Sequence, residues 1–457
     1  MDNFHSIVKR IINPDLSIDP PKPGIYRFLY AEQRETSKIH LRIDKDGSAV
    51  LLINASRILH LNPVAGFMAY LALMKIPDNQ ACKSFSRVYK IGHQQLKQDY
   101  AQFARQLAEL IRPDGACPIH DLGLDTIPPF SVLPSAPYRM DLALTYRCNN
   151  DCSHCYNARP RSFPEISTHQ WKDILNRLWD CGIPHVVFTG GEPTLRSDLP
   201  ELIAHAELNG QITGINTNGR RLSDKAFLQE LIDAGLDHVQ ITLESHDPMI
   251  HNSMVKSEHA WDQTVAGIRN ALDTSLYVMT NTTMLRHNSP FLEQTLQFLA
   301  ALGVPTVGLN ALIYAGKGLE FDAGIPETEL SPLLEVARHI TAANQQRLIW
   351  YTPTQYCHFD PVQMNLGVKG CTAALYNMCI EPNGSVLPCQ SYYQQVGNIL
   401  EQSWEEIWEH PLCLSLRNRE NIPEKCNHCA FLIECGGGCP LKNHAFALSG
   451  GIYDQRS

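Results

Sequence analysis

Three cysteines with the spacing Cys-x3-Cys-x2-Cys stand just before an aromatic residue: Cys148, Cys152 and Cys155, then Tyr156. Thiolates this close together can bind three irons of a cubane cluster and leave the fourth iron without a protein ligand. Such an open iron can bind a small molecule, so the spacing predicts a site of chemistry. A zinc site completed by His154 or by a distant ligand is the alternative, because thiolates and imidazoles also suit tetrahedral zinc.

Most of the other cysteines lie near the end of the chain. Nine of the fifteen fall between Cys357 and Cys439, whereas Cys82, Cys117 and Cys181 are scattered. In a chain of this size in a reducing compartment, clustered cysteines indicate metal binding more often than disulfides. We therefore expect the C-terminal segment to hold metal, and the scattered cysteines to be small buried hydrophobes.

The composition argues against two classes of protein. Apolar residues make up 44% of the 457 residues, and the formal net charge is -9. An acidic chain is poorly suited to binding nucleic acid by neutralising phosphates. The sequence contains no apolar run long enough to cross a membrane, and its start lacks the charged and apolar regions of a signal peptide. We therefore expect a cytoplasmic protein with no nucleic-acid or membrane partner.

Periodicity divides the chain into four parts. Three short strands and two helices predict a small α+β domain over residues 22–112, and the proline-rich residues 113–136 predict a linker. Six strands alternate with helices over residues 137–345, which predicts an α/β fold with a parallel sheet curved into a partial (β/α)6 TIM-like barrel. Residues 346–457 form a Cys-, Gly- and Pro-rich domain that needs metal to fold. The expected barrel strands are residues 140–146, 185–189, 212–216, 238–243, 276–284 and 306–313.

The cysteine triplet resembles the signature of radical S-adenosylmethionine (radical SAM) enzymes, and Gly190-Gly191-Glu192-Pro193 after the second strand resembles the GGEP loop of that family. The resemblance implies a [4Fe-4S] cluster that binds S-adenosylmethionine and, after one-electron cleavage, gives a deoxyadenosyl radical that abstracts a hydrogen. It also implies that Glu192 helps to hold the methionyl ammonium. By position, the residues that would contact the cofactor are Tyr156, Gly190, Gly191, Glu192, Pro193, Asn216, Asn218, Thr242, Glu244, Lys256, Asn310 and Ile313.

Some of these assignments depart from the family pattern. Thr242 and Lys256 stand where relatives usually have Ser and Arg. Strand-end turns and helix caps are the alternative roles for such polar residues.

The C-terminal cysteines resemble the SPASM extension, which binds auxiliary iron–sulfur clusters; a zinc ribbon is the alternative. The resemblance implies one or two further [4Fe-4S] clusters. Cys371, Cys389 and Cys439 would bind the first, with Cys357 or Cys379 as candidate fourth ligand. Cys426, Cys429 and Cys435 would bind the second. The family's last cysteine is absent after Cys439, so the second cluster has an open iron, or a ligand such as His444 or Asp454, or takes Cys357 or Cys379.

Residues 22–112 resemble the winged-helix peptide-recognition domains of enzymes that modify ribosomally made peptides. The likeness rests on Leu61-Asn62-Pro63-Val64-Ala65 and on Asp99, Phe103 and Leu107. It implies that a leader peptide adds as a strand to an exposed sheet edge. A generic α+β domain that only packs on the enzyme is the alternative.

Together these resemblances imply a radical SAM oxidoreductase that modifies a peptide. Auxiliary clusters favour a net oxidation, such as a thioether or carbon–carbon cross-link, with electrons from a reductase, flavodoxin or ferredoxin. A second hypothesis is the same chemistry on a small molecule, a tetrapyrrole or a sulfatase-type protein residue. A third is a non-catalytic iron–sulfur electron carrier, which would not cleave S-adenosylmethionine.

Overall fold

The chain forms two compact units, one comprising Met1–Ser135 with Trp179–Pro184 and the other Ala136–Leu178 with His185–Ser457. The computed structural model describes residues 17–32, 35–54, 57–89, 93–111, 133–158, 161–420 and 422–443. Most of the expected linker and the N-terminal lead-in lie outside these residues.

The first unit contains a four-stranded antiparallel sheet in the order β1-β2-β3-β4. Its strands are β1 (Gly24–Glu32), β2 (Glu35–Ile43), β3 (Ala49–Ile53) and β4 (Arg57–Leu61). Alternate apolar side chains of β2, namely Ile39, Leu41 and Ile43, are buried in one core together with apolar residues of three helices. These helices are α2 (Pro63–Leu73), α3 (Asp78–Val88) and α4 (His93–Leu110).

The structure adds two elements to those expected in this unit. β4 was not predicted because its five residues are too few to show a period that separates strand from helix. α3 was not predicted because it is polar overall and its buried face has only three apolar residues, Ala81, Cys82 and Phe85. The small sheet with helices is otherwise as expected.

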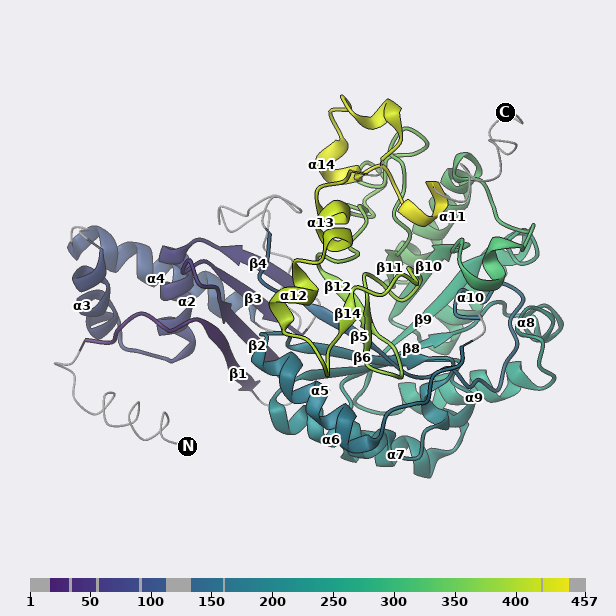
Figure 1. Cartoon of the computed structure of the whole chain (residues 1–457), viewed down its shortest axis with the longest axis horizontal. Helices are drawn as coiled ribbons and strands as arrows, with labels where there is room; N and C mark the ends of the chain where they lie inside the picture. The colour runs from purple at the N-terminus through teal and green to yellow at the C-terminus, as the bar shows by residue number, and fades with distance from the viewer. Residues whose placement is uncertain are drawn as a thin grey trace. The chain divides into compact units, whose positions relative to one another are not determined.

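The second unit is built on one ten-stranded sheet in the order β11-β10-β9-β8-β7-β6-β5-β12-β13-β14 (Figure 1). Neighbours from β11 to β12 are parallel, and β13 and β14 continue antiparallel. The strands are β5 (Arg139–Thr145), β6 (His185–Gly190), β7 (Ile212–Thr217), β8 (His238–Thr242), β9 (Tyr277–Met284), β10 (Thr306–Ala311), β11 (Arg347–Trp350), β12 (Asn377–Ile380), β13 (Ser385–Leu387) and β14 (Gly397–Asn398).

Helices connect the parallel strands, and α5, α6, α7 and α9 lie along one side of them (Figure 1). Each packs an apolar stripe on the sheet; in α5 this stripe is Trp171, Ile174, Leu175 and Leu178, all fully buried. The helices of the barrel are α5 (Thr168–Asp180), α6 (Leu199–Asn209), α7 (Lys225–Asp233), α8 (Pro248–Val255), α9 (Ala260–Leu272), α10 (Leu292–Leu302) and α11 (Glu327–Ala343). The six expected strand–helix repeats are all present, and α8 is an addition.

Because the strands are parallel, their carboxyl ends meet at one edge of the sheet. That edge carries the cysteine triplet after β5 and the glycine loop after β6. No described helix has the length and apolar content needed to cross a bilayer.

The C-terminal region is joined to the barrel by backbone pairing. β12 runs parallel to β5, with Cys379 opposite Asp141 and Ile380 opposite Leu142. The short helices α12 (Trp404–Trp408), α13 (Pro411–Arg417) and α14 (Leu432–Cys435) follow. The strand that leads into the triplet therefore has a neighbour on both sides.

We expect Ile380→Ala to destabilise the second unit. Ile380 is fully buried where β12 meets β5, and truncation of a buried Ile to Ala costs about 2–4 kcal/mol. Chemical denaturation followed by tryptophan fluorescence measures the change. Val362→Ala, at a position that is 46% exposed, is the control and should leave the midpoint unchanged; equal midpoints for both variants would contradict the packing role of β12.

Candidate active site and auxiliary cysteine sites

The loop that bears the cysteine triplet is bonded to the glycine loop after β6. Gly191 N donates to Thr145 O at 2.7 Å, and Glu192 N donates to Arg147 O at 2.9 Å. A Cβ atom at Gly190 would lie 2.1 Å from Thr145 O, and one at Gly191 would lie 2.4 Å from Arg147 O. Only glycine allows the two backbones to approach this closely.

Helix α8 supports the middle of the triplet loop. Asp151 N donates to Val255 O, and Ser153 N donates to Met254 O, both at 3.0 Å. The last turn of a helix has carbonyl groups without helical partners, and here the loop supplies their donors. The position of the second cysteine is thus set by a helix that the sequence did not reveal.

A loop after β10 holds the end of the triplet. Lys317 N donates to Cys155 O at 3.0 Å, and Lys317 Nζ forms an ion pair with Asp151. A Cβ atom at Gly316 would lie 2.6 Å from the carbonyl oxygens of both Cys155 and Tyr156.

Arg220, just after β7, binds the start of the triplet loop. Its guanidinium donates to Asn149 O, to Asn150 Oδ1 at 2.7 Å and to Ser257 Oγ at 2.9 Å. Its Nε donates to Gln263 Oε1 at 2.6 Å. One side chain therefore ties the start of the triplet loop to α9 and to Ser257, just after α8.

Glu192 is fully buried and organises three loops. Its Oε1 accepts from Thr194 N, Thr194 Oγ1 and Thr217 Oγ1, and its Oε2 accepts from Asn218 N at 2.8 Å. Asn218 Nδ2 in turn donates to Asn149 Oδ1 at 2.6 Å. Burial raises the pKa of Glu192 despite these donors. Since a carboxylate oxygen can accept two hydrogen bonds, Oε2 can accept one more. The expected contact of Glu192 with a methionyl ammonium stays a prediction.

Glu244, at the end of β8, fixes His154 within the triplet. Glu244 Oε1 lies 2.9 Å from His154 Nε2, and Glu244 Oε2 accepts from Thr283 N at 2.9 Å. Both side chains are buried, with exposed fractions of 1% and 8%. His154 is thus engaged by a carboxylate, and Glu244, expected to contact the cofactor, positions the loop.

The three thiols of the triplet lie within one another's electrostatic field. Cys148 is exposed, and Cys152 and Cys155 are half-buried. Burial raises the pKa of Cys152, and the Cys155 thiol, Glu244 and the Cys148 thiol raise it further. Crowded thiols suit a site where metal binding removes the protons. Among the described residues, no group of three His, Cys, Asp or Glu side chains could hold a single metal ion. A cubane cluster does not need such a group, because each thiolate binds a different iron.

Polar side chains line the strands next to this site. Asn216 and Thr242 are half-buried at the ends of β7 and β8. Asn281 Nδ2 donates to Asn310 Oδ1 at 2.8 Å, and Asn310 Nδ2 lies 3.4 Å from Thr283 Oγ1. Asn310, one of the residues expected to contact the cofactor, thus already has hydrogen-bond partners. Asn281, which was not predicted, is one of them.

The other predicted contacts lie at the periphery of the triplet loop. Lys256 is an exposed left-handed cap at the end of α8, and Ile313 is half-buried after β10.

Tyr156 reaches the auxiliary region: its hydroxyl donates to Gln390 Oε1 at 3.0 Å, and Gln390 Nε2 donates to Thr189 Oγ1 at 3.0 Å. Gln390 directly follows Cys389, so this chain of bonds joins the two cysteine regions.

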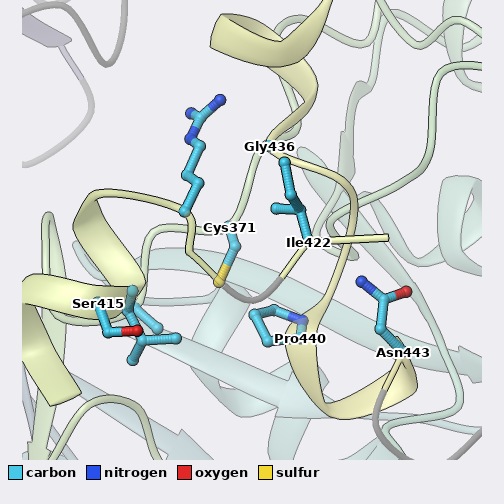
Figure 2. Close-up of a pocket in the computed structure, with 9 residues that line it drawn as sticks. Cys371, Ser415, Ile422, Gly436, Pro440 and Asn443 are labelled. Carbon is cyan, nitrogen blue, oxygen red and sulfur yellow. The ribbon is translucent and has the colours of Figure 1, made fainter. Parts of the chain in front are cut away.

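Cys371, Cys389 and Cys439, here termed the first trio, share one environment. Burial raises the pKa of Cys371, and the neighbouring Cys439 and Cys389 thiols raise it further. Cys371 also lies on the wall of a pocket formed with Ser415, Ile422, Gly436, Pro440 and Asn443 (Figure 2). The structure thus brings together the three cysteines expected at the first auxiliary cluster.

Cys379 has a different environment. It is fully buried in β12, packs with Ala143 and Leu387, and its thiol lies 3.7 Å from Ile380 O. The nearby Cys389 thiol adds to the effect of burial in raising its pKa. Its contacts are those of a core residue.

Cys426, Cys429 and Cys435, here termed the second trio, surround the short helices near the end of the described chain. Cys426 and Cys435 are buried, and Cys429 is exposed. The candidate ligands His444 and Asp454 lie outside the described residues.

Glu327, at the start of α11, anchors this region. It is 3% exposed and pairs with His358 Nδ1 at 2.7 Å and with Lys442 Nζ at 2.8 Å. Burial would raise the pKa of Glu327, but the bonds from His358 and Lys442 outweigh it, so the pKa is lowered. The carboxylate thus connects the segment around Cys357 to the turn after Cys439.

Several residues that build the site were absent from the sequence prediction. Arg220, Lys317 and Asn281 stand just after or within strands of the barrel. Arg220 and Lys317 had the same signal as the predicted residues, a polar side chain after a strand end, whereas Asn281 lies in the middle of β9. α8 gave no such signal, because its eight residues are too short for a clear helical period.

Comparisons with known proteins agree with this geometry. A family model described as the radical SAM superfamily matches residues 142–308, and one described as an iron-sulfur cluster-binding domain, SPASM, matches residues 371–430. These matches confirm the two families predicted for the triplet and the tail.

Solved structures with a similar fold include two of SuiB from Streptococcus suis. SuiB bound to the precursor peptide SuiA has a TM-score of 0.67 and 16% identity, over 91% of this chain and 96% of SuiB. SuiB bound to S-adenosylmethionine has a TM-score of 0.65 and 18% identity, over 88% and 95%. anSMEcpe with bound AdoMet has a TM-score of 0.55 and 15% identity, over 70% and 100%. These likenesses confirm the expected fold.

We expect Gly191→Ala to remove the cluster of the triplet. A methyl group 2.4 Å from Arg147 O forces the two loops apart, so iron and sulfide should fall by about one cubane, roughly four irons per chain. Colorimetric iron and sulfide assays after anaerobic reconstitution measure this. Leu208→Ala, at a position on α6 that is 81% exposed, is the control. Full iron content in Gly191→Ala would contradict the role of the loop contact.

We expect Glu327→Gln to destabilise the apoprotein at neutral pH by about 1–3 kcal/mol, since hydrogen bonds to a charged group are lost. The folded pKa of Glu327 is lowered, so its stabilisation exists above the ordinary glutamate pKa and is lost as pH falls through the folded value. The difference from wild type should therefore shrink on acidification below about pH 4.5. Denaturation at several pH values measures it. The control is Glu335→Gln, which removes an exposed ion pair of the same helix and should leave the free energy of unfolding unchanged. If the free-energy difference between Glu327→Gln and wild type did not depend on pH, the ionic role of Glu327 would be contradicted.

Proposed function

This chain is a radical SAM enzyme with a SPASM domain, and we propose that it acts on a ribosomally made peptide whose leader binds the N-terminal unit. The radical SAM domain binds a [4Fe-4S] cluster and S-adenosylmethionine, and the SPASM domain binds auxiliary iron–sulfur clusters. When bound, the first cluster and S-adenosylmethionine supply the abstraction of a hydrogen from the substrate.

The observation that carries the proposal is a separate small sheet with two outer strands. Among the described strands, β1 pairs only with β2, and β4 pairs only with β3. Leu29 on β1 is 60% exposed, and Ile58 on β4 is 39% exposed. An outer strand offers unpaired backbone groups and alternate side-chain positions, which is how extended peptides are bound. SuiB, whose fold covers 91% of this chain, is bound to its precursor peptide.

The residues of the barrel have supporting roles in this proposal. Arg220, Glu192 and Glu244 hold the triplet loop in place through the contacts described above. The amide side chains of Asn281 on β9 and Asn310 on β10 are bonded to each other at 2.8 Å. Rigid placement of these groups limits the positions that a reactive intermediate can reach.

The modification proposed is a net oxidation, such as a thioether or carbon–carbon cross-link. Auxiliary clusters can accept an electron from the substrate, and a cytoplasmic reductase, flavodoxin or ferredoxin would supply the reducing electron. A second candidate is a protein residue of the sulfatase type. anSMEcpe, which has a bound peptide in two structures, shares the fold over 69% of this chain, so a peptide substrate suits this candidate too. That candidate does not require a leader.

Anaerobic incubation of the reconstituted enzyme with S-adenosylmethionine, a reductant and peptides encoded beside its gene tests the proposal. We expect deoxyadenosine to form and one peptide to lose two hydrogens by mass spectrometry. The same peptides without their leader should not be modified. Equal turnover of the leaderless peptide would favour the second candidate, and deoxyadenosine formed only with a small metabolite would overturn the peptide proposal.

The affinity of edge variants for a fluorescent leader peptide shows whether the peptide binds at β1 or at β4. We expect either Leu29→Lys or Ile58→Lys to weaken binding by about tenfold or more, because a charge would enter the contact. Val88→Lys, at an exposed position at the end of α3, is the control. Unchanged affinity in both edge variants would contradict strand addition.

A further inference from the structure

The segment before Cys357 lies against the second trio. Tyr356 N donates to Cys435 Sγ at 3.4 Å, and Cys435 Sγ donates to Thr354 O at 3.4 Å. Two residues that precede Cys357 thus contact the same sulfur. Cys357 itself is exposed, and its thiol lies 3.9 Å from Gln355 Oε1.

Further contacts hold this segment in place. Gln355 Nε2 donates to Gly437 O at 3.2 Å and to Asn443 Oδ1 at 3.0 Å. A Cβ atom at Gly438 would lie 2.9 Å from Gln355 Cγ, and Gly438 has a φ of +80°. Glu327 binds the same segment, because Gln355 N donates to its Oε2 at 3.3 Å. Cys357 therefore has a fixed position beside the trio.

The path of the chain brings Cys357 next to the second trio, because the adjacent Tyr356 and the nearby Thr354 both contact Cys435 Sγ. The three cysteines of the second trio belong to the SPASM pattern, and Cys357 is about 70 residues upstream of Cys426 in the sequence.

We propose that Cys357 is the fourth protein ligand of the auxiliary cluster bound by the second trio. The second cluster then has a thiolate on every iron, with no position for substrate. Cys379, the other candidate, is fully buried in β12 and has its contacts in the strand core.

Thiol protection in the wild-type chain tests this assignment. Anaerobically loaded and cluster-free protein are treated with iodoacetamide, and each cysteine is quantified by mass spectrometry. An exposed free thiol reacts in both states, whereas a ligand reacts only after cluster removal. We expect Cys357 to be protected in the loaded protein to the same extent as Cys429, with Cys181 as the reference that does not change. Reaction of Cys357 in the loaded protein, with Cys429 protected, would overturn the proposal.

A variant gives a second measurement. In a background with Cys148, Cys152 and Cys155 replaced by Ala, Cys357→Ser should change the electron paramagnetic resonance spectrum of one reduced auxiliary cluster, or lower iron by about four per chain. Cys181→Ser is the matched control. A spectrum and an iron content equal to those of the parent would overturn the assignment. Neither experiment uses a peptide, so the result is independent of the proposed substrate.

Discussion

Two backbone hydrogen bonds between neighbouring strand-end loops support the rest of the site. Gly191 N and Glu192 N donate to carbonyl groups of Thr145 and Arg147, and the absence of side chains at Gly190 and Gly191 lets the loops meet. The cysteine triplet begins at the next residue. Its geometry is therefore set by main-chain contacts, which vary less than side-chain contacts because the peptide group has a fixed shape.

Buried carboxylates extend this arrangement across the molecule. Glu192 joins the ends of β6 and β7, Glu244 joins β8 and β9 to His154, and Glu327 joins α11 to the cysteine tail. Each accepts several hydrogen bonds, which offsets the cost of burying a charge. These three buried carboxylates thus connect the loops that carry the cysteines to their neighbours by hydrogen bonds and ion pairs.

The sequence predicted those features that depend on long periods or on motifs. The six strand–helix repeats, the triplet and the glycine loop each have such a signal, and their positions agree with the structure to within a few residues. Short elements such as β4 and α8 lack a full period, so local pattern could not reveal them. The partners of Glu192 and Glu244 depend on contacts between distant segments, and the nearness of Cys357 to Cys435 depends on how the tail folds back. Such contacts arise from tertiary packing, which one sequence does not display.

The pairing of β12 with β5 has a consequence for the order of folding. During synthesis β5 can pair with β6 soon after it emerges, but its other side has no partner until residues 377–380 are made. An unpaired strand edge is open to wrong associations. The strand that leads into the triplet is therefore among the first of its sheet to be synthesised and among the last to gain both neighbours.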